Sequence, residues 1–186
     1  MRQIGWGVAI SLLAVGLDGW NSSAMLQRKR AKILVGMGLG ALWGFVLVMA
    51  PEWLGFGYLP APIALPGAFI GPGLFLVAVI GWLAQRRFFD DAIIDGEPFA
   101  VGSLEEIAQR VLTNTVEQLV LALAIWPLVA ISLGGAVAIS LGIGFTLMRV
   151  LFWIGYLMSP PLRALGFAGT FYPTLVAAIW SIWVWV

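Results

Sequence analysis

Long apolar stretches alternate with short polar segments along this chain, and the lengths of the apolar stretches match the thickness of a lipid bilayer. A membrane-spanning helix needs about 20 predominantly apolar residues. Five stretches fit that requirement, and we predict transmembrane helices at residues 31–50, 66–84, 103–131, 136–158 and 169–186. The pattern therefore predicts an all-α integral membrane protein.

Short local motifs set the boundaries of these helices. A Ser-Leu-Glu-Glu capping box at residues 103–106 opens the third helix. A Leu-Gly-Gly sequence at residues 133–135 predicts a tight turn before the fourth helix. Pro160 and Pro161 end that helix, because proline lacks the backbone N–H donor and clashes with the preceding turn. We therefore expect the fifth helix to begin only at Gly169.

The segment before the second predicted helix has a less regular pattern. Residues 4–17 are apolar, but they are few for a membrane span and include three glycines, which weaken a helix. We expect an interfacial helix there, then the transmembrane helix at 31–50, and we treat residues 1–66 as an N-terminal extension. A signal peptide that begins at Arg2 is the alternative, but no A-x-A cleavage pattern follows it.

Composition supports the membrane class and restricts the chemistry. Of the 186 residues, 61% are hydrophobic and only 10% are charged, and the formal net charge is +1. A net charge so close to zero indicates no basic surface for nucleic acid, so we expect no nucleic-acid partner. Cysteine and histidine are both absent, which excludes disulfides, thiolate or imidazole nucleophiles and the usual zinc sites. We expect no metal, and chemistry that uses Arg, Tyr, Ser, carboxylates or a reactive group of the ligand.

The basic residues gather at one end of the predicted helices, and this placement sets the orientation. Counted along five spans, that end receives Arg28, Lys29, Arg30, Lys32, Arg86, Arg87, Arg110, Arg149 and Arg163. The loop at the opposite end, residues 51–66, carries only Glu52. The positive-inside rule then places the basic loops in the cytoplasm. We expect an integral protein of the bacterial inner membrane.

A polar stripe interrupts the apolar pattern of the third helix. Arg110, Asn114 and Glu117 have i, i+4 and i+7 spacing, which places them within about 60° of one another around a helix. Ionisable residues inside a membrane are costly, so by default they indicate a functional site. An interhelical salt bridge that only holds the bundle together explains the same stripe equally well.

The cytoplasmic end combines this stripe with further arginines and with Tyr156. Several arginines around one carboxylate suit a multiply charged, peptide-like anion. Arg86 and Arg87 have a second explanation, because they end the second helix, where the helix dipole favours cations.

At this point the motifs resemble those of a known family. The R-x-x-x-N-x-x-E pattern that begins at Arg110 resembles a helix signature of the MAPEG family, the membrane-associated proteins in eicosanoid and glutathione metabolism. The run RVLFWIGYLMSPPLRALGF at 149–167 and the Arg86-Arg87 pair resemble two further parts of that family, in the same order and spacing. The resemblance covers about residues 67–186, a MAPEG-like four-helix domain, and leaves the N-terminal extension outside it.

The resemblance implies a fold, a ligand and roles for particular residues. Family members are trimers of four-helix protomers that bind glutathione between neighbouring protomers, near the cytoplasmic side. The resemblance implies that Arg163 faces the glutathione thiol and favours its thiolate, which makes it the candidate catalytic residue. The implied glutathione-binding residues are Arg86, Arg110, Asn114, Glu117 and Tyr156, and further candidates are Arg87, Arg149 and Ser159.

This chain departs from its glutathione-binding relatives at three positions of that site. Gln118 and Phe152 stand where those relatives carry tyrosines, and Leu112 replaces a glutamine. Phe152 keeps the ring but lacks a hydroxyl that could bond the peptide. Each such hydrogen bond contributes about 0.5–1.5 kcal/mol, so the departures predict weaker glutathione binding.

Two functions follow from these patterns. The first is a membrane-bound glutathione-dependent transferase or peroxidase that acts on lipophilic electrophiles or lipid hydroperoxides. Glutathione, the co-substrate, would enter from the cytoplasm, and the lipophilic acceptor would arrive from the lipid bilayer. The alternative is a non-catalytic MAPEG-like lipid-binding or scaffold subunit of a larger membrane complex, docked to a partner protein through residues 1–66. A channel or transporter fits less well, because the arginines cluster at one face.

Small residues suggest where helices meet in the assembly. We predict a closed homotrimer, because hydrocarbon cannot satisfy the polar stripe, with Ala122, Ala124 and Ala130 of the third helix allowing close packing between subunits. The first span carries glycines at 36, 38, 40 and 44. We expect these glycines to form one smooth face that docks to a neighbour or partner.

Overall fold

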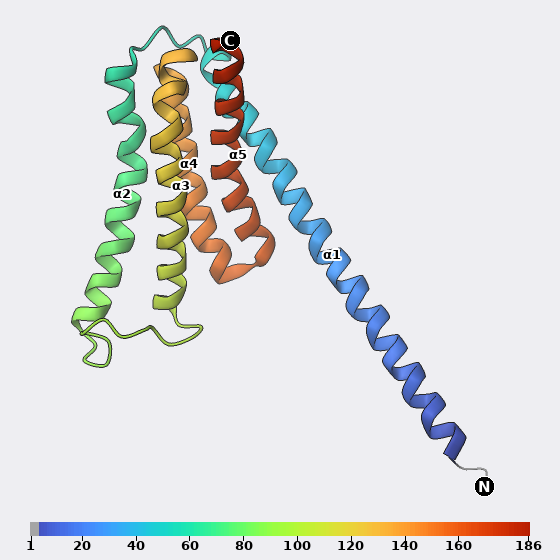
Figure 1. Ribbon diagram of the computed structural model, residues 1–186. Helices are drawn as coiled ribbons and strands as arrows, with labels where there is room; N and C mark the ends of the chain where they lie inside the picture. The colour runs from blue at the N-terminus through green and yellow to red at the C-terminus, as the bar shows by residue number, and fades with distance from the viewer. Residues whose placement is uncertain (1–3) are drawn as a thin grey trace. The chain divides into compact units, whose positions relative to one another are not determined.

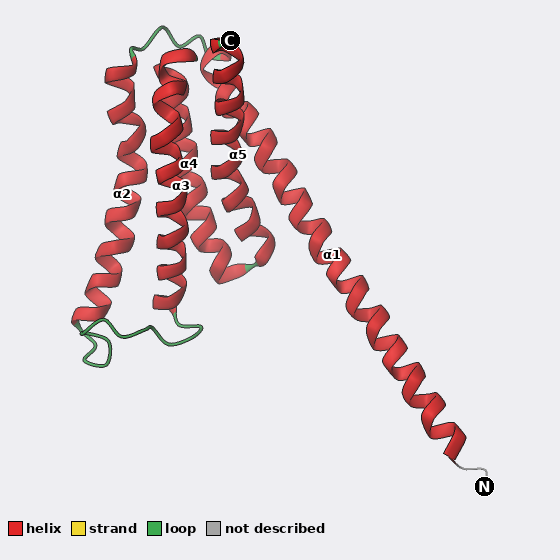
Figure 2. Cartoon of the chain, viewed as in Figure 1, coloured by secondary structure: helices red, strands yellow, loops and turns green. Residues whose placement is uncertain are grey.

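A computed structural model describes the backbone of residues 4–186 and the side chains from Gln27 onward, except those of Lys29 and Lys32. The chain divides into two compact units, Met1–Val35 and Gly36–Val186. The described residues form five helices and no strand (Figure 2). These helices are α1 (Ile4–Trp53), α2 (Ala61–Phe88), α3 (Leu104–Ser132), α4 (Gly135–Met158) and α5 (Pro160–Trp185).

All five helices contain a stretch long and apolar enough to cross a membrane. The stretch in α1 runs from Ile33 to Trp53, and the other four stretches coincide with whole helices. Prolines inside four of the helices are tolerated, because neighbouring helices can satisfy the backbone groups that they free. The prediction of an all-α integral membrane protein with five spans is confirmed.

Residues 4–17 and the span predicted at 31–50 belong to the same helix, α1. The side chains of residues 4–17 lie outside the described ones, so their placement at a membrane interface stays a prediction. The division at residue 66 also stays a prediction.

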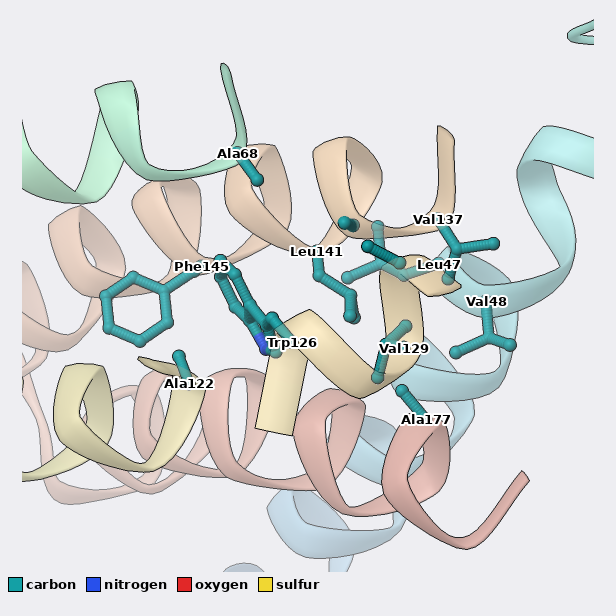
Figure 3. Close-up of a cluster of buried hydrophobic side chains, with 12 residues drawn as sticks. Leu47, Val48, Ala68, Ala122, Trp126, Val129, Val137, Leu141, Phe145 and Ala177 are labelled. Atoms are coloured by element: carbon teal, nitrogen blue, oxygen red, sulfur yellow. The ribbon is translucent and has the colours of Figure 1, made fainter. Parts of the chain in front are cut away.

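Helices α2–α5 lie side by side, and α4 contacts each of the other three (Figure 1). The core forms where they meet around Trp126, a fully buried residue of α3. Its ring stacks on Phe69 at 5.0 Å and meets the edge of Phe145 at 5.9 Å, while its Nε1 donates to Thr174 Oγ1 at 3.2 Å. Figure 3 shows Trp126 beside Phe145, with Leu141 and Val129 farther along the same cluster. One side chain thus contacts α2, α4 and α5.

The C-terminal part of α1, from Gly36 onward, packs against α5 through glycines on one face. A Cβ at Gly40 would lie 2.5 Å from the Cβ of Ala168, and a Cβ at Gly44 would lie 2.9 Å from Pro173. Gly38 has no such neighbour within 4 Å. The expected docking face is therefore occupied by helix α5 of the same chain, and Gly38 is not part of it.

Two of the three alanines predicted to line a subunit interface are buried within the single chain. Ala122 and Ala130 are buried inside the chain, whereas Ala124 is exposed. The prediction is wrong for the first two, because they face Trp126 and its neighbours in the protomer's own core.

The ends of the helices follow the sequence motifs, with one correction. Ser103 Oγ accepts a hydrogen bond from Glu106 N at 3.1 Å, which confirms Ser103 as the N-cap. The Glu106 carboxylate accepts from Gly102 N at 2.6 Å, one residue before the N–H that a capping box uses. Helix α5, however, starts at Pro160 and not at Gly169. A proline in the first turn of a helix costs no hydrogen bond, because the N–H at that position has no partner in the helix. Helix α5 can therefore begin at Pro160, directly after Ser159, the residue that caps the end of α4.

Candidate functional site

The centre of the polar region is Arg149 of α4, whose side chain is completely buried. Its guanidinium donates hydrogen bonds to Asn114 Oδ1 at 2.8 Å, to Gly166 O at 3.1 Å and to Thr170 Oγ1 at 2.5 Å. The three acceptors come from α3 and α5. Arg149 therefore joins three helices through hydrogen bonds in the interior of the bundle.

Neutral groups surround this buried cation. Its Cζ lies 4.4 Å from the centre of the Phe152 ring and 5.6 Å from that of Phe145, so aromatic faces supply part of its stabilisation. Among the described residues, no carboxylate forms an ion pair with it, and its Nε has no partner. The charge of Arg149 is thus balanced by oxygen dipoles and ring faces rather than by an anion.

Asn114 connects this buried cation to a carboxylate. Arginine has only donors, so the oxygen of the Asn114 amide must face Arg149. The amide nitrogen then donates to Glu117 Oε2 at 3.2 Å. Because Glu117 is exposed, this chain of hydrogen bonds, Arg149–Asn114–Glu117, runs from the core to the surface and fixes the orientation of the Glu117 carboxylate. We call this chain the relay.

Arg163 and Tyr156 form a second group. The guanidinium carbon of Arg163 lies 4.8 Å from the centre of the Tyr156 ring. That ring meets Phe152 at 5.1 Å and at right angles. Phe152 therefore contacts both Arg149 and Tyr156, and it connects the relay to the Arg163 group.

A glycine fixes the backbone of Arg163. A Cβ at Gly155 would come within 2.5 Å of Arg163 Cα, so the two helices approach as closely as glycine allows. Ser159 joins them, since its N–H donates to Gly155 O at 3.0 Å and its carbonyl accepts from Arg163 N at 3.2 Å. The Ser159 hydroxyl does not cap α5.

Arg110 lies one turn before Asn114 and makes a separate contact. Its guanidinium pairs with Glu106 at 2.6 Å, and 58% of its side chain is exposed. The helix spacing keeps it on the same side of α3 as Asn114 and Glu117. The three residues of the predicted stripe thus share one face of α3, but Arg110 pairs with Glu106 and not with a residue of the relay.

The double arginine of α2 instead secures the α2–α3 loop. Arg86 Nε pairs with Glu105 at 2.7 Å and its guanidinium lies over Trp82. Arg87 donates to the carbonyls of Ile93 and Glu97, both at 3.1 Å, and stacks 4.1 Å from the Phe99 ring. Neither arginine contacts the relay within this chain.

Thr170 is a site residue that reading the sequence missed. Its hydroxyl accepts from Arg149 and donates to Phe167 O at 2.9 Å. An arginine inside an apolar span was the available signal, since it requires buried acceptors nearby. Which threonine or carbonyl supplies them depends on how α5 packs against α4. In the described part of the chain, no cluster of His, Cys, Asp or Glu side chains is arranged to hold a metal ion.

Comparison with known proteins gives one family match. The family model described as the MAPEG family matches residues 66–183, which include every residue of the relay and both members of the Arg163 group. No curated protein and no solved structure matches the chain.

Proposed function

The chain belongs to the MAPEG family, and from that premise we propose that it is a membrane-bound glutathione-dependent transferase or peroxidase. Its second substrate would be a lipophilic electrophile or a lipid hydroperoxide that reaches the site from the bilayer. The observation that carries this proposal is the relay, which holds an exposed carboxylate in one orientation beside Arg110. A surface with one oriented carboxylate and nearby cations suits a zwitterionic peptide.

Charge complementarity suggests how glutathione would bind. The peptide carries one ammonium group and two carboxylates. Glu117 would accept the ammonium, with its carboxylate oriented by Asn114. Arg110 would take a carboxylate by exchanging its pairing with the half-buried Glu106, because an ion pair near the surface contributes only about 0.2–1 kcal/mol. Arg86 would take the second carboxylate by the same exchange with Glu105.

Arg163 would act on the thiol. A free thiol has a pKa of ~8.5, and a guanidinium beside the sulfur favours the charged thiolate. Arginine remains charged even when it is partly desolvated. The Tyr156 ring lies against the Arg163 guanidinium and would line the site. The thiolate would then attack the acceptor, with proximity and electrostatic stabilisation supplying the rate enhancement.

We further propose that the site is completed in a closed homotrimer, with the basic loops in the cytoplasm. Arg110, Glu117 and Arg163 all have exposed side chains in the single chain. Hydrocarbon cannot satisfy such groups, so a neighbouring subunit that covers them would both exclude lipid and enclose the peptide.

Thermal stabilisation by glutathione tests the proposal directly. The purified protein should unfold at a higher temperature as glutathione is added, and Glu117→Ala should remove most of the shift. Glu97→Ala is the matched control, because Glu97 is an exposed carboxylate of the α2–α3 loop outside the relay. A parent protein that glutathione does not stabilise would exclude the enzymatic proposal.

A non-catalytic lipid-binding or scaffold subunit is the second candidate. It is favoured by the ion pairs of Arg86 and Arg110, which satisfy both cations without a ligand. The first 66 residues would then dock a partner protein. This candidate predicts no glutathione-dependent shift and co-purification of a stable partner that is lost when residues 1–35 are removed.

A further inference from the structure

Two adjoining cavities are lined by the end of α1, the α1–α2 loop and the start of α4. Figure 1 shows this loop at the end of α2 opposite the α2–α3 loop. The larger cavity has a volume of about 510 Å³ and lies between α1 and the first turns of α4. Its walls are apolar side chains, among them Leu47, Ile139 and Ile143. Such a cavity has room for a hydrocarbon chain and offers it only apolar contacts.

The hydroxyl of Ser140 is the polar side-chain group in that wall, and it is already bonded. Ser140 Oγ donates to Leu47 O at 2.7 Å, or alternatively to Val137 O at 2.8 Å. Because the hydroxyl serves the backbone, it does not require a polar ligand atom. Binding in the larger cavity would therefore be driven by the burial of apolar surface.

The second cavity is mostly apolar but has more polar surface than the first, with which it shares a wall. Its volume is about 310 Å³, and Pro51, Phe56, Leu59 and Ala136 line both cavities. Glu52 lines the second cavity and is the charged residue in its wall. Within the described residues, Glu52 forms no ion pair. An apolar cavity and a free carboxylate are thus neighbours.

The walls are held in place by backbone contacts. Gly135 N donates to Leu59 O at 3.1 Å, which ties the α1–α2 loop to the start of α4. Phe56 N donates to Pro51 O at 3.0 Å, which closes the end of α1. A preformed cavity loses little conformational entropy when a ligand binds.

We propose that these cavities bind a membrane phospholipid with an amine headgroup, of the phosphatidylethanolamine class. One acyl chain occupies the larger cavity, and the ammonium group pairs with Glu52. A carboxylate attracts a cationic headgroup and repels an anionic one. A primary ammonium, unlike the quaternary nitrogen of choline, can also donate hydrogen bonds to the Glu52 carboxylate.

This site is separate from the glutathione proposal. Ile139 and Tyr156 lie on the same helix, and 17 residues of helix place them about 25 Å apart. The α1 and loop residues that line the cavities all precede residue 66, where the family match begins. The lipid site is therefore a consequence of the added N-terminal span.

Native mass spectrometry of the full chain tests the proposal, after reconstitution with dioleoyl lipids that carry ethanolamine, choline or glycerol headgroups. The parent protein should retain one ethanolamine lipid per chain, with a preference of about two- to fivefold over the others, as expected for a partly exposed ion pair. Glu52→Gln should keep a bound lipid but lose the preference. Glu97→Gln, at the other end of the molecule, should leave the preference unchanged.

A pocket-filling change tests the acyl site. Ile139→Trp should reduce the lipid-bound fraction several-fold, whereas Ile154→Trp, an exposed position on the same helix outside both cavities, should not. Ala50→Phe fills the cavity from α1 and replaces Ile139→Trp if that variant does not fold. Equal lipid retention in the parent and the filled variants overturns the acyl site. A preference for the choline or the glycerol headgroup, or no preference, overturns the assignment of the headgroup.

Discussion

At the scale of single residues, the buried guanidinium of Arg149 decides how the polar region is arranged. Its three acceptors are neutral oxygens, so its cost of burial is offset by hydrogen bonds and ring faces and not by an ion pair. Because the cation orients Asn114, it also orients the carboxylate that we propose to hold glutathione. The Arg149 side chain therefore stabilises the bundle and also orients the proposed glutathione-binding carboxylate.

Arg149→Met should destabilise the protein by several kcal/mol. Methionine fills similar space but removes the donor to Asn114 Oδ1 and to Thr170 Oγ1, and an acceptor left unsatisfied costs about 1–3 kcal/mol. Unfolding in detergent, followed by circular dichroism, measures the change. Arg30→Met removes an exposed arginine and should shift the midpoint little; equal effects of the two changes would contradict a structural relay.

Arg163 and Glu117 should separate thiol activation from peptide binding. Bound glutathione should show thiolate absorbance near neutral pH, and Arg163→Ala should remove that band with little change in affinity. Glu117→Ala should weaken binding first. Ultraviolet difference spectra and calorimetry measure the two properties, and a thiolate band that survives Arg163→Ala would refute the catalytic role of this arginine.

At the scale of elements, glycines set the approach of α1 to the rest of the bundle. Gly40 and Gly44 lie against the backbones of Ala168 and Pro173, where no side chain fits. The family match starts at residue 66, so this contact joins a helix outside the matched residues to a helix inside them. The added span is thus part of the folded unit that begins at Gly36.

Gly40→Leu should therefore destabilise the protein, whereas Gly38→Leu should not. A side chain at residue 40 overlaps the Ala168 backbone, and overpacking typically costs about 1–3 kcal/mol. A side chain at residue 38 meets no atom within 4 Å. Thermal unfolding of the two variants in the same detergent compares them, and equal midpoints would show that α1 does not pack on α5 through this face.

At the scale of the whole molecule, exposed charged side chains connect the proposed binding site to the proposed trimer. Exposed charges on α3 and α5 cannot face hydrocarbon, so the proposed trimer and the proposed site depend on each other. Native mass measurements should give a trimer, and a stable monomer that binds glutathione would separate the two proposals.

Two truncations should distinguish the two compact units. Deleting residues 1–35 removes one unit and leaves the other, Gly36–Val186, complete, so its unfolding midpoint should stay near that of the parent. Deleting residues 1–55 also removes the α1 surface that covers α5, and should lower the midpoint clearly. Equal midpoints for the two truncations would show that α1 adds nothing to the stability of the bundle.

The sequence by itself determined the membrane class, the number of spans, the N-cap of α3 and the family. Each depends on the length of apolar runs or on the spacing of nearby residues, which a single helix expresses without knowledge of its neighbours. Arg110, Asn114 and Glu117 share a face for the same reason, because helix geometry alone places them there.

Only the tertiary structure decided which of those residues meet. The spacing of Arg110 and Asn114 did not reveal that one pairs with Glu106 while the other accepts a hydrogen bond from Arg149. Thr170 became a ligand of the buried arginine through the crossing of α4 and α5, and a glycine face predicted to dock a partner was covered by α5 instead. Contacts between distant segments depend on which faces of several helices pack together, and no local pattern carries that information.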